Sequence, residues 1–454
     1  MEAILSAILF AILLGFLLLA LRFLRLPGLP GYVSVSIFLL KCFLGIGWLY
    51  GLPEVNKQNR LSNMDALFKE SEVLFELAFS NNADFLRLAG GLNSESPYYD
   101  RLTVAMPHWD SRKNEADDLF FLSSRSMIRI HACLRFLSGN SSPAQVVIFN
   151  FFVIACLIFS FKTFIPYFTG REKWFLTALF LVPSVFVWSA GLFNFSLSFG
   201  LLSIALSVAI RTVIQPLSFS KGLVYLFVLL LTSLALPVLS FVLIMSLILV
   251  LALQAGKWIS GTSAGMALFI IILVLVYLMD QLLFNQMFTN QLIAAQQESL
   301  NKLASGGLAI GVENQALKPV WWSFLRNMPE ALFNGAFRPG LLDALSSFQW
   351  LSALESASMV ILIALAVGLF TPSSGKQEFL LRNFLFSASV WFLIAVGLTS
   401  NVWSDISARR AIFLPYATMA LLLVIDTNRL KAIIFEVLNI HGNNTDNGSN
   451  IGNR

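Results

Sequence analysis

Apolar runs about as long as a bilayer is thick recur along this whole chain. A helix that crosses a membrane needs about 20 mostly apolar residues, because its backbone polar groups must be hydrogen-bonded within the helix. The stretch 222–254 is too long for one helix, and Pro237 near its middle predicts two short helices that meet there. With those two, about eleven transmembrane helices are expected in an all-α polytopic membrane protein. The nine other runs lie at 4–21, 32–50, 146–165, 175–190, 196–213, 264–284, 350–370, 383–400 and 409–425.

A chain of this composition cannot form a water-soluble globule. Of its 454 residues, 57% are hydrophobic and only 12% are charged, which leaves too little polar surface to cover a core. The net charge of +5 is spread along the chain rather than gathered in one patch, so no nucleic-acid partner is expected. The three cysteines stand apart and predict neither a disulfide framework nor a metal site.

The apolar runs divide the chain into membrane segments and loops. The expected order is spans one and two in 1–50, a first long loop at 51–145, spans three to eight in 146–284, a second long loop at 285–349, spans nine to eleven in 350–425 and a disordered tail at 426–454. Within the first loop, 61–80 and 120–137 carry apolar residues at helical spacing, which predicts amphipathic helices on the membrane surface. Such helices could cover a site between the spans or could simply close the bundle.

The orientation follows from Lys and Arg in the short loops, because these residues resist translocation. With eleven spans, the basic residues of six loops fall on one side, which is therefore expected to be the cytoplasm. The N-terminus and both long loops are then external, and the C-terminus is cytoplasmic. The residues concerned are Arg22, Arg25, Lys162, Arg171, Lys173, Arg211, Lys221, Lys257, Lys376, Arg382, Arg429 and Lys431.

Costly polar residues lie in or beside the apolar runs. Arg409 and Arg410 open the last run, Asp405 precedes them, and Lys41, Asp280 and Glu355 lie within other runs. By this topology all except Lys41 lie near the external boundary, where an active or binding site is the default hypothesis. Neighbours on a helix point about 100° apart. One arginine is therefore expected to bind a ligand while the other pairs with one of the three acids; snorkelling to the interface is the alternative. Lys41, in mid-span, is expected to face the bundle interior, in a structural or a functional role.

Several segments, in this order, resemble a family of bacterial polytopic proteins found with surface-polysaccharide genes. That family is similar to the glycosyltransferase-C superfamily and to exopolysaccharide and O-antigen polymerases. The resemblance covers roughly 32–425, and "PEALFNGAFRP" is its most specific part. The segments are "LLKCFLGIGWLY", "SRSMIRIHACLRFLS", "LVPSVFVWSAGLF", "NMPEALFNGAFRPGLLDALSSFQWLSALES" and "ARRAIFLPY".

The resemblance implies a glycosyltransferase-C-like fold in the bacterial inner membrane, with an active site on the external face. The substrate would be a sugar carried on polyprenyl phosphate or diphosphate, surrounded by membrane lipids; protein partners stay open. Transfer needs a base that takes the proton of the acceptor hydroxyl and cations that hold the phosphate. Members of the superfamily can bind a divalent metal ion, but this sequence lacks the usual ligand motifs, so no cofactor and no metal ligand is assigned.

Candidate residues for these roles follow from the resemblance and from residue chemistry. Asp65 best matches the acid that the superfamily places early in the first external loop, although "SNMD" also suits a helix N-cap. Asp110 is the second candidate base, and His108 beside it titrates near neutral pH. For the phosphate, Arg409 and Arg410 come first and Arg338 in "FRPG" second, because guanidinium groups bind phosphate oxygens in pairs.

The expected function is a membrane glycosyltransferase or polysaccharide polymerase. A transporter or flippase of a lipid-linked saccharide is one alternative, but no internal repeat is visible and most polar groups are peripheral. A non-catalytic subunit of an envelope assembly is the other. Asn194 and Phe195 stand where the family usually has a lysine followed by an acid, and Leu236 stands where it often has a lysine. These departures indicate a different donor or acceptor, or a protein without catalytic activity.

Overall fold

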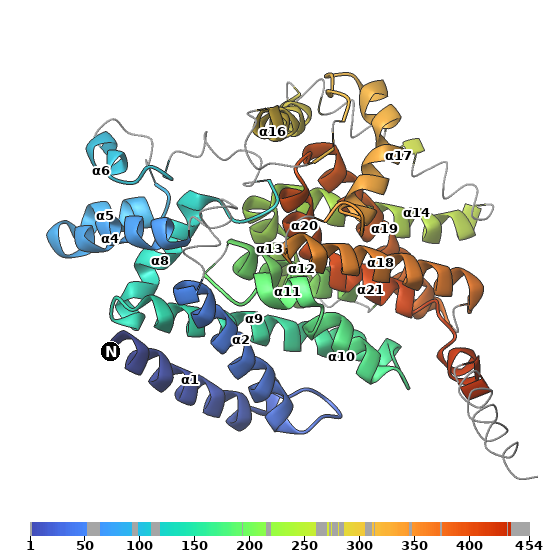
Figure 1. Ribbon diagram of the computed structural model, residues 1–454, viewed down its shortest axis with the longest axis horizontal. Helices are drawn as coiled ribbons and strands as arrows, with labels where there is room; N and C mark the ends of the chain where they lie inside the picture. The colour runs from blue at the N-terminus through green and yellow to red at the C-terminus, as the bar shows by residue number, and fades with distance from the viewer. Residues whose placement is uncertain are drawn as a thin grey trace, which may run out of the picture.

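The computed structural model of the chain is a helical bundle with a group of shorter helices at one side (Figure 1). It describes residues 2–436 apart from a set of short gaps. The gaps are 52–63, 93–98, 110–118, 193, 215–218, 260–269, 272–273, 275–279, 281–285, 305–310, 313, 345–346, 373–374 and 434.

In this described part the secondary structure is helical, and no strand is formed. The β-type pairing there consists of two isolated bridges, Gly311 with Val402 and Phe370 with Ile425. Six helices among the described residues are long and apolar enough to cross a membrane. The prediction of an all-α membrane protein is therefore confirmed, whereas the count of about eleven spans stays a prediction. The six stretches are Glu2–Ala20, Gly31–Tyr50, Ser142–Tyr167, Asn194–Thr212, Gln349–Gly368 and Lys376–Thr399.

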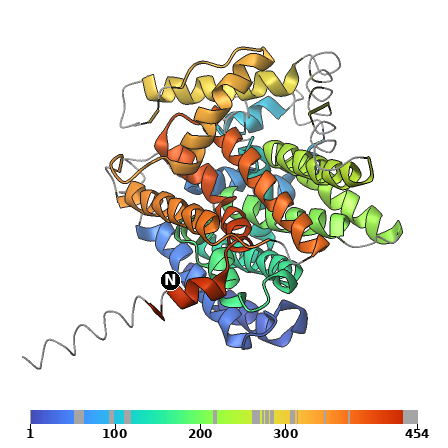
Figure 2. The ribbon, with the colours of Figure 1, turned by 90° about the vertical axis from the view of Figure 1, so that its right-hand side faces the viewer.

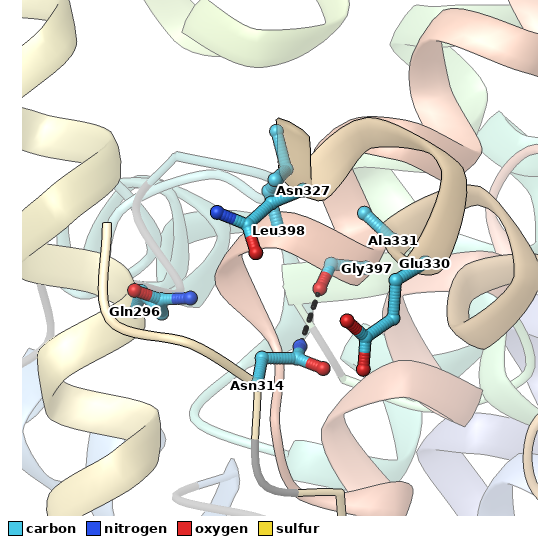
Figure 3. Close-up of a pocket in the computed structure, with 7 residues that line it drawn as sticks. All are labelled: Gln296, Asn314, Asn327, Glu330, Ala331, Gly397 and Leu398. Atoms are coloured by element: carbon cyan, nitrogen blue, oxygen red, sulfur yellow. Dashed lines mark hydrogen bonds between the residues drawn. The ribbon is translucent and has the colours of Figure 1, made fainter. Parts of the chain in front are cut away.

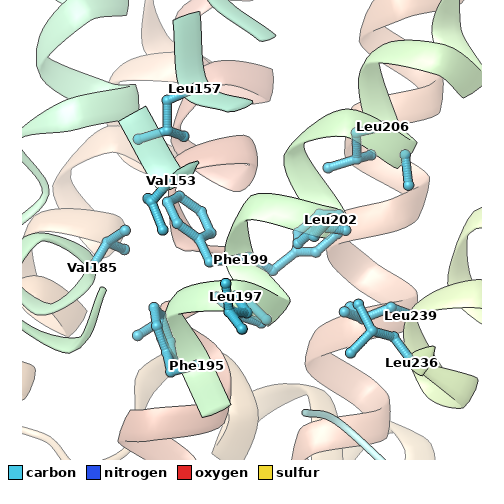
Figure 4. Packing of buried hydrophobic residues seen from close by; sticks show 14 of the residues in the cluster. Val153, Leu157, Val185, Phe195, Leu197, Phe199, Leu202, Leu206, Leu236 and Leu239 are labelled. Atoms are coloured by element: carbon cyan, nitrogen blue, oxygen red, sulfur yellow. The ribbon is translucent and has the colours of Figure 1, made fainter. Parts of the chain in front are cut away.

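Helix α9 (Ser142–Phe164) lies at the centre of the N-terminal half of the bundle. It packs against α1 (Glu2–Ala20), α2 (Gly31–Gly51) and α12 (Asn194–Ile214). Short 3-10 turns, η1 (Arg22–Leu24) and η4 (Ile165–Tyr167), follow α1 and α9. Side chains of α9, α11, α12 and α14 meet in the buried apolar core (Figure 4). Outward-facing apolar residues cover α1, as a lipid-facing helix requires.

Pro237 separates α13 (Phe219–Ala235) from α14 (Pro237–Ile259), which confirms the predicted break. Proline has no N–H and its ring crowds the preceding turn, so the helix cannot continue through it without disruption. The first loop satisfies part of the new helix end, because the Val238 N–H donates to the Leu119 carbonyl at 3.1 Å.

Two further runs, each expected as one span, are broken in the structure. The run 175–190 forms α10 (Glu172–Phe180) and α11 (Pro183–Trp188), and 409–425 forms α20 (Trp403–Ala411) and α21 (Leu414–Leu422). The reason is again proline: Pro183 and Pro415 stand in the first turn of α11 and α21, where each lacks an N–H group and its ring crowds the preceding turn. Helix α10 packs on α21, and α11 packs on α20, so the broken helices lie side by side.

The first long loop contains α4 (Met64–Ser80), α5 (Asn82–Ala89), α6 (Asp100–Val104) and α8 (Ser124–Ser138). Helices α4 and α8 confirm the two predicted helices, and they pack on each other at one side of the bundle (Figure 1). Ser123 accepts the Ser126 N–H at 3.2 Å and so caps α8.

The second long loop contains α16 (Met287–Ala304) and α17 (Trp321–Phe337), which lie on the flank opposite α1 and α2 (Figure 2). Helix α17 packs closely on α19 (Lys376–Thr399), and α18 (Ser347–Gly368) follows it. A Cβ added at Gly397 would stand 1.9 Å from the Ala331 carbonyl oxygen, and one at Gly335 would stand 2.2 Å from that of Leu393. Glycine at both positions lets the two backbones touch.

The start of the tail differs from the expectation of disorder. Residues 427–433 are helical, because the Asp426 carboxylate accepts the N–H groups of Asn428 at 3.0 Å and Arg429 at 3.1 Å and so caps the turn. Residues 437–454 lie outside the described residues.

Candidate functional site

Arg410 ties three helices together from the last turn of α20. Only 1% of the residue is exposed. Its guanidinium donates to the carbonyl oxygens of Ala336 at 2.9 Å and Arg338 at 3.1 Å, where α17 ends. It also donates to the Ser356 hydroxyl at 2.8 Å and to the Ser352 hydroxyl and carbonyl at 2.7 and 3.1 Å, on α18. Neutral acceptors of the protein thus engage both terminal nitrogens.

Arg409 points to a different set of neighbours, as its position on the helix requires. It donates to the Ser400 hydroxyl at 2.8 Å and to the Thr399 carbonyl at 3.4 Å, at the C-terminal end of α19. Its guanidinium carbon lies 5.0 Å from the centre of the Phe120 ring, a cation–π contact with the first loop. The two arginines therefore link α20 to separate parts of the protein.

Lys41 and Glu355 lie at the two ends of α11. The Glu355 carboxylate accepts the Ser184 N–H at 2.6 Å, at the helix N-terminus. The Lys41 ammonium donates to the Ser189 hydroxyl at 2.5 Å and the Phe186 carbonyl at 3.4 Å, at the C-terminus. A negative charge at the N-terminus and a positive charge at the C-terminus both complement the helix dipole. The expectation that Lys41 faces the bundle interior is confirmed, since 1% of it is exposed.

The other two acids that were expected near the arginines are Asp280 and Asp405. Asp280 accepts the N–H groups of Phe288 at 3.1 Å and Thr289 at 3.2 Å, and the Thr289 hydroxyl at 2.5 Å. Asp280 therefore caps α16. Asp405 lies on α20, one turn before Arg409.

Arg338 is the most accessible of the three candidate arginines. Its side chain is 36% exposed and forms an ion pair with Asp343, which also accepts the Gly340 N–H at 2.8 Å. Burial opposes the charge on Asp343, but the Arg338 and Gly340 hydrogen bonds hold its pKa below the ordinary value. Through its carbonyl, Arg338 is joined to Arg410, so the structure brings these two residues together.

The loop that carries Arg338 presents apolar side chains outward. Leu341 is 44% exposed and Leu342 is 99% exposed. Phe333 on α17 and Leu354 on α18 are also exposed. Exposed large apolar residues beside a cation are typical of a surface at the membrane interface, where the stem lies in lipid and the charge reaches the head groups.

In the first loop, His108 is held by an acid that sequence reasoning missed. The imidazole Nδ1 of His108 lies 2.5 Å from the Glu70 Oε1, and the backbone N–H of His108 donates to the Glu70 Oε2 at 3.0 Å. The imidazole is 26% exposed. One signal pointed to Glu70: it lies between Leu67 and Leu74 on the buried face of α4, where a carboxylate needs a partner.

The two candidate bases stay predictions. Asp65 is in the first turn of α4, and its side chain is not described; Asp110 lies outside the described residues. Helix α4 packs mainly on α8 and α5, whereas α20 packs on α11, α17, α18, α19 and α21. Asp65 and the arginines of α20 therefore stand on different groups of helices.

A small pocket with polar side chains around it lies between α16, α17 and α19 (Figure 3), at residues to which the sequence assigned no role in a site. Gln296, Asn327 and Glu330 line it, and Asn314 donates to the Gly397 carbonyl at 3.0 Å across it. It is too tight for a water molecule. Asn314 thus ties the second loop to α19, whereas the amides of Gln296 and Asn327 bond within the second loop. Sequence offers only a weak signal for such contacts.

Among the described residues, no three His, Cys, Asp or Glu side chains are placed to hold a metal ion. No family model, no curated protein and no solved structure matches the chain. The residues and their geometry are therefore the basis for any functional assignment.

Proposed function

We propose that this chain is a membrane glycosyltransferase or polysaccharide polymerase of the glycosyltransferase-C type. It would act in the bacterial inner membrane, with its N-terminus outside and its C-terminus in the cytoplasm. Its substrate would be a polyprenyl-phosphate-linked sugar, used at the external face for cell-surface polysaccharide synthesis. The observation that carries the proposal is the partly exposed Arg338 guanidinium beside the outward-facing Leu341 and Leu342.

A lipid-linked sugar has a hydrocarbon tail next to a phosphate, and the Arg338 loop offers a matching pair of surfaces. Leu341 and Leu342 suit contact with the tail, and the guanidinium suits the phosphate oxygens. Arg410 supports this arrangement from inside, because its hydrogen bond to the Arg338 carbonyl fixes the backbone from which the side chain extends. We therefore assign Arg338 the contact with phosphate and Arg410 the role of positioning it.

In the transfer step, the acceptor hydroxyl oxygen bonds to the anomeric carbon of the sugar. The bond between that carbon and the phosphate oxygen breaks, and the lipid phosphate leaves with the electron pair. A base takes the hydroxyl proton, and Asp65 is the first candidate and Asp110 the second. Arg338 stabilises the negative charge that develops on the leaving phosphate.

The test is glycolipid extension by the purified protein in lipid nanodiscs. Arg338→Ala is expected to lower the rate by about a hundredfold or more, because it removes the group that stabilises the leaving charge. Arg338→Lys should keep part of the activity, since it retains charge but not the paired donors. Arg326→Ala, an exposed arginine on α17, is the matched control and should be unchanged. A wild-type rate in Arg338→Ala would refute the assignment.

One observation favours a transporter or flippase of the same lipid-linked saccharide as a second candidate. The two broken helices, α10–α11 and α20–α21, lie side by side, and four buried ionisable residues lie on or beside α11 and α20: Lys41, Glu355, Arg409 and Arg410. Discontinuous helices that meet within a bundle are typical of transporter binding sites. A fluorescent lipid-linked saccharide in sealed vesicles separates the two functions. Transbilayer movement without an acceptor supports the transporter, whereas product formed only with an acceptor supports the transferase.

A further inference from the structure

Two arginines of α8 lie against one indole ring in the first loop. The guanidinium carbons of Arg125 and Arg129 are 5.6 and 5.0 Å from the centre of the Trp109 ring. Arg125 also donates through Nε to the Trp109 carbonyl at 2.9 Å. The arginines are four residues apart, so they lie on the same face of α8 and repel each other.

Arg129 has the less compensated charge. In the part of the chain that the structure describes, no ion pair involves it, and its buried Nε has no hydrogen-bond partner. The guanidinium lies against the turn after α5, where a Cβ added to Gly91 would stand 3.4 Å from Nη1. Gly91 has φ +78°, a conformation that side chains disfavour, so no Cβ stands beside the guanidinium. Burial, and then the charge of Arg125, lower the pKa of Arg129.

Glu70, the acid that contacts this segment, is already engaged. Both oxygens of the Glu70 carboxylate contact His108, one through the backbone N–H and one through Nδ1. His108 directly precedes Trp109, so this contact fixes the segment on which the arginines stack. Glu70 therefore orders the site without supplying an oxygen to Arg129.

We propose that Arg125, Arg129 and Trp109 form a binding site for an oxyanion, a phosphate or carboxylate group, in the first long loop. Two adjacent oxygens of such a group can accept paired N–H donors of a guanidinium, which satisfies the buried donor and offsets the repulsion between the two cations. This site is separate from the Arg338 loop, and it stands whether or not the chain transfers sugars.

The experiment uses the full chain in nanodiscs of uncharged lipid, titrated with inorganic phosphate, glucose 1-phosphate and glucuronate by calorimetry. Saturable binding that weakens as salt rises is expected for at least one of these probes. Arg129→Gln should weaken it about tenfold or more, as expected for the loss of a charge-assisted pair of hydrogen bonds. Arg129→Lys should bind with an affinity between those of the wild type and Arg129→Gln. Arg87→Gln on α5, whose arginine is exposed and pairs with Asp84, is the control and should bind as wild type.

Two further readouts make the result decisive. In the first, anionic lipid is added to the nanodisc. If it abolishes binding of the soluble probes, the anion belongs to a lipid head group; if it does not compete, the anion belongs to a soluble molecule. Circular dichroism and thermal unfolding of Arg129→Gln exclude loss of the fold as the cause of weaker binding. The proposal is overturned by a wild type that binds none of the probes and no anionic lipid, or by a folded Arg129→Gln that binds as tightly as wild type.

Discussion

Lys41 and Glu355 are separated by most of the sequence, yet they contact opposite ends of the same short helix, α11. The carboxylate lies at the N–H end and the ammonium at the carbonyl end. Each charge is thus stabilised by backbone groups that the short helix leaves without internal partners. This arrangement shows how two ionisable side chains can be buried among apolar spans without contacting each other.

Replacing Glu355 tests this arrangement. Glu355→Ala should lower the free energy of unfolding by about 2 kcal/mol, because the Ser184 N–H loses its acceptor in a buried place. Glu355→Gln should cost less, since an amide oxygen can still accept. Detergent-induced unfolding followed by circular dichroism measures both. Equal losses in the two variants would mean that the charge, rather than the hydrogen bond, holds α11.

The contact between α17 and α19 depends on glycine. Gly397→Ala should destabilise the protein by about 1–3 kcal/mol, because its Cβ would stand 1.9 Å from a backbone oxygen that cannot rotate away. Gly47→Ala on α2 is the matched control: no atom lies within 4 Å of its added Cβ, and alanine favours helix. Thermal unfolding should show a lower midpoint for the first variant and an equal or higher midpoint for the second. Similar midpoints would contradict the close approach of the backbones.

The sequence predicted the long helices well, because a run of about 20 apolar residues is compatible with few structures other than a membrane-spanning helix. It also predicted the break at Pro237, where the apolar stretch is too long for one helix. The breaks before Pro183 and Pro415 were missed, because each falls in a run short enough for a single span. A proline in such a run can kink a helix or end it, and the packing of neighbouring helices decides between these outcomes.

The candidate site was less predictable, for a physical reason. Arg410 is held by the carbonyl oxygens of Ala336, Arg338 and Ser352, and backbone acceptors leave no mark in the residue types. The expected partner for such an arginine was an acid, and Glu355 does interact electrostatically with Arg410, although no direct ion pair joins the two among the described residues. Likewise, Glu70 and His108 lie 38 residues apart, and no local spacing links them.

His131 predicts how stability depends on pH. The side chain is fully buried in the first loop, and burial, with a contribution from Arg135, lowers its pKa to about 4 although Gln145 bonds it. The unfolded chain, with an ordinary pKa of 6.5 there, binds the proton more readily. The stabilisation is therefore complete above about pH 6.5 and is lost as the pH falls towards 4, up to about 3 kcal/mol. Unfolding measured from pH 7.5 to 4.5 should show this slope in the wild type and a shallower one in His131→Gln.

Arg410 and Arg338 should respond differently to the same conservative change. A lysine has three donors and no planar fork, so Arg410→Lys cannot reach all five acceptor contacts and should lower both stability and activity. Arg338→Lys should lower activity while unfolding stays within about 0.5 kcal/mol, as for a partly exposed side chain. Unfolding and glycolipid extension on the same preparations check both. Stability unchanged in Arg410→Lys would contradict its role as an internal tie.

Reporter fusions test the orientation on which the external site depends. An enzyme that is active only outside the cytoplasm should be active when fused after Asp100, in the first long loop, and inactive after Gly375, which directly precedes α19. The physical reason is that Lys376 and Arg382 are among the basic residues that resist translocation, whereas long loops are translocated largely regardless of their charge. A fluorescent protein that folds only in the cytoplasm should give the reverse pattern. If the fusion at Asp100 reports the cytoplasm, the Arg338 loop cannot be assigned to the external face, and the proposed use of an externally presented lipid-linked sugar fails with it.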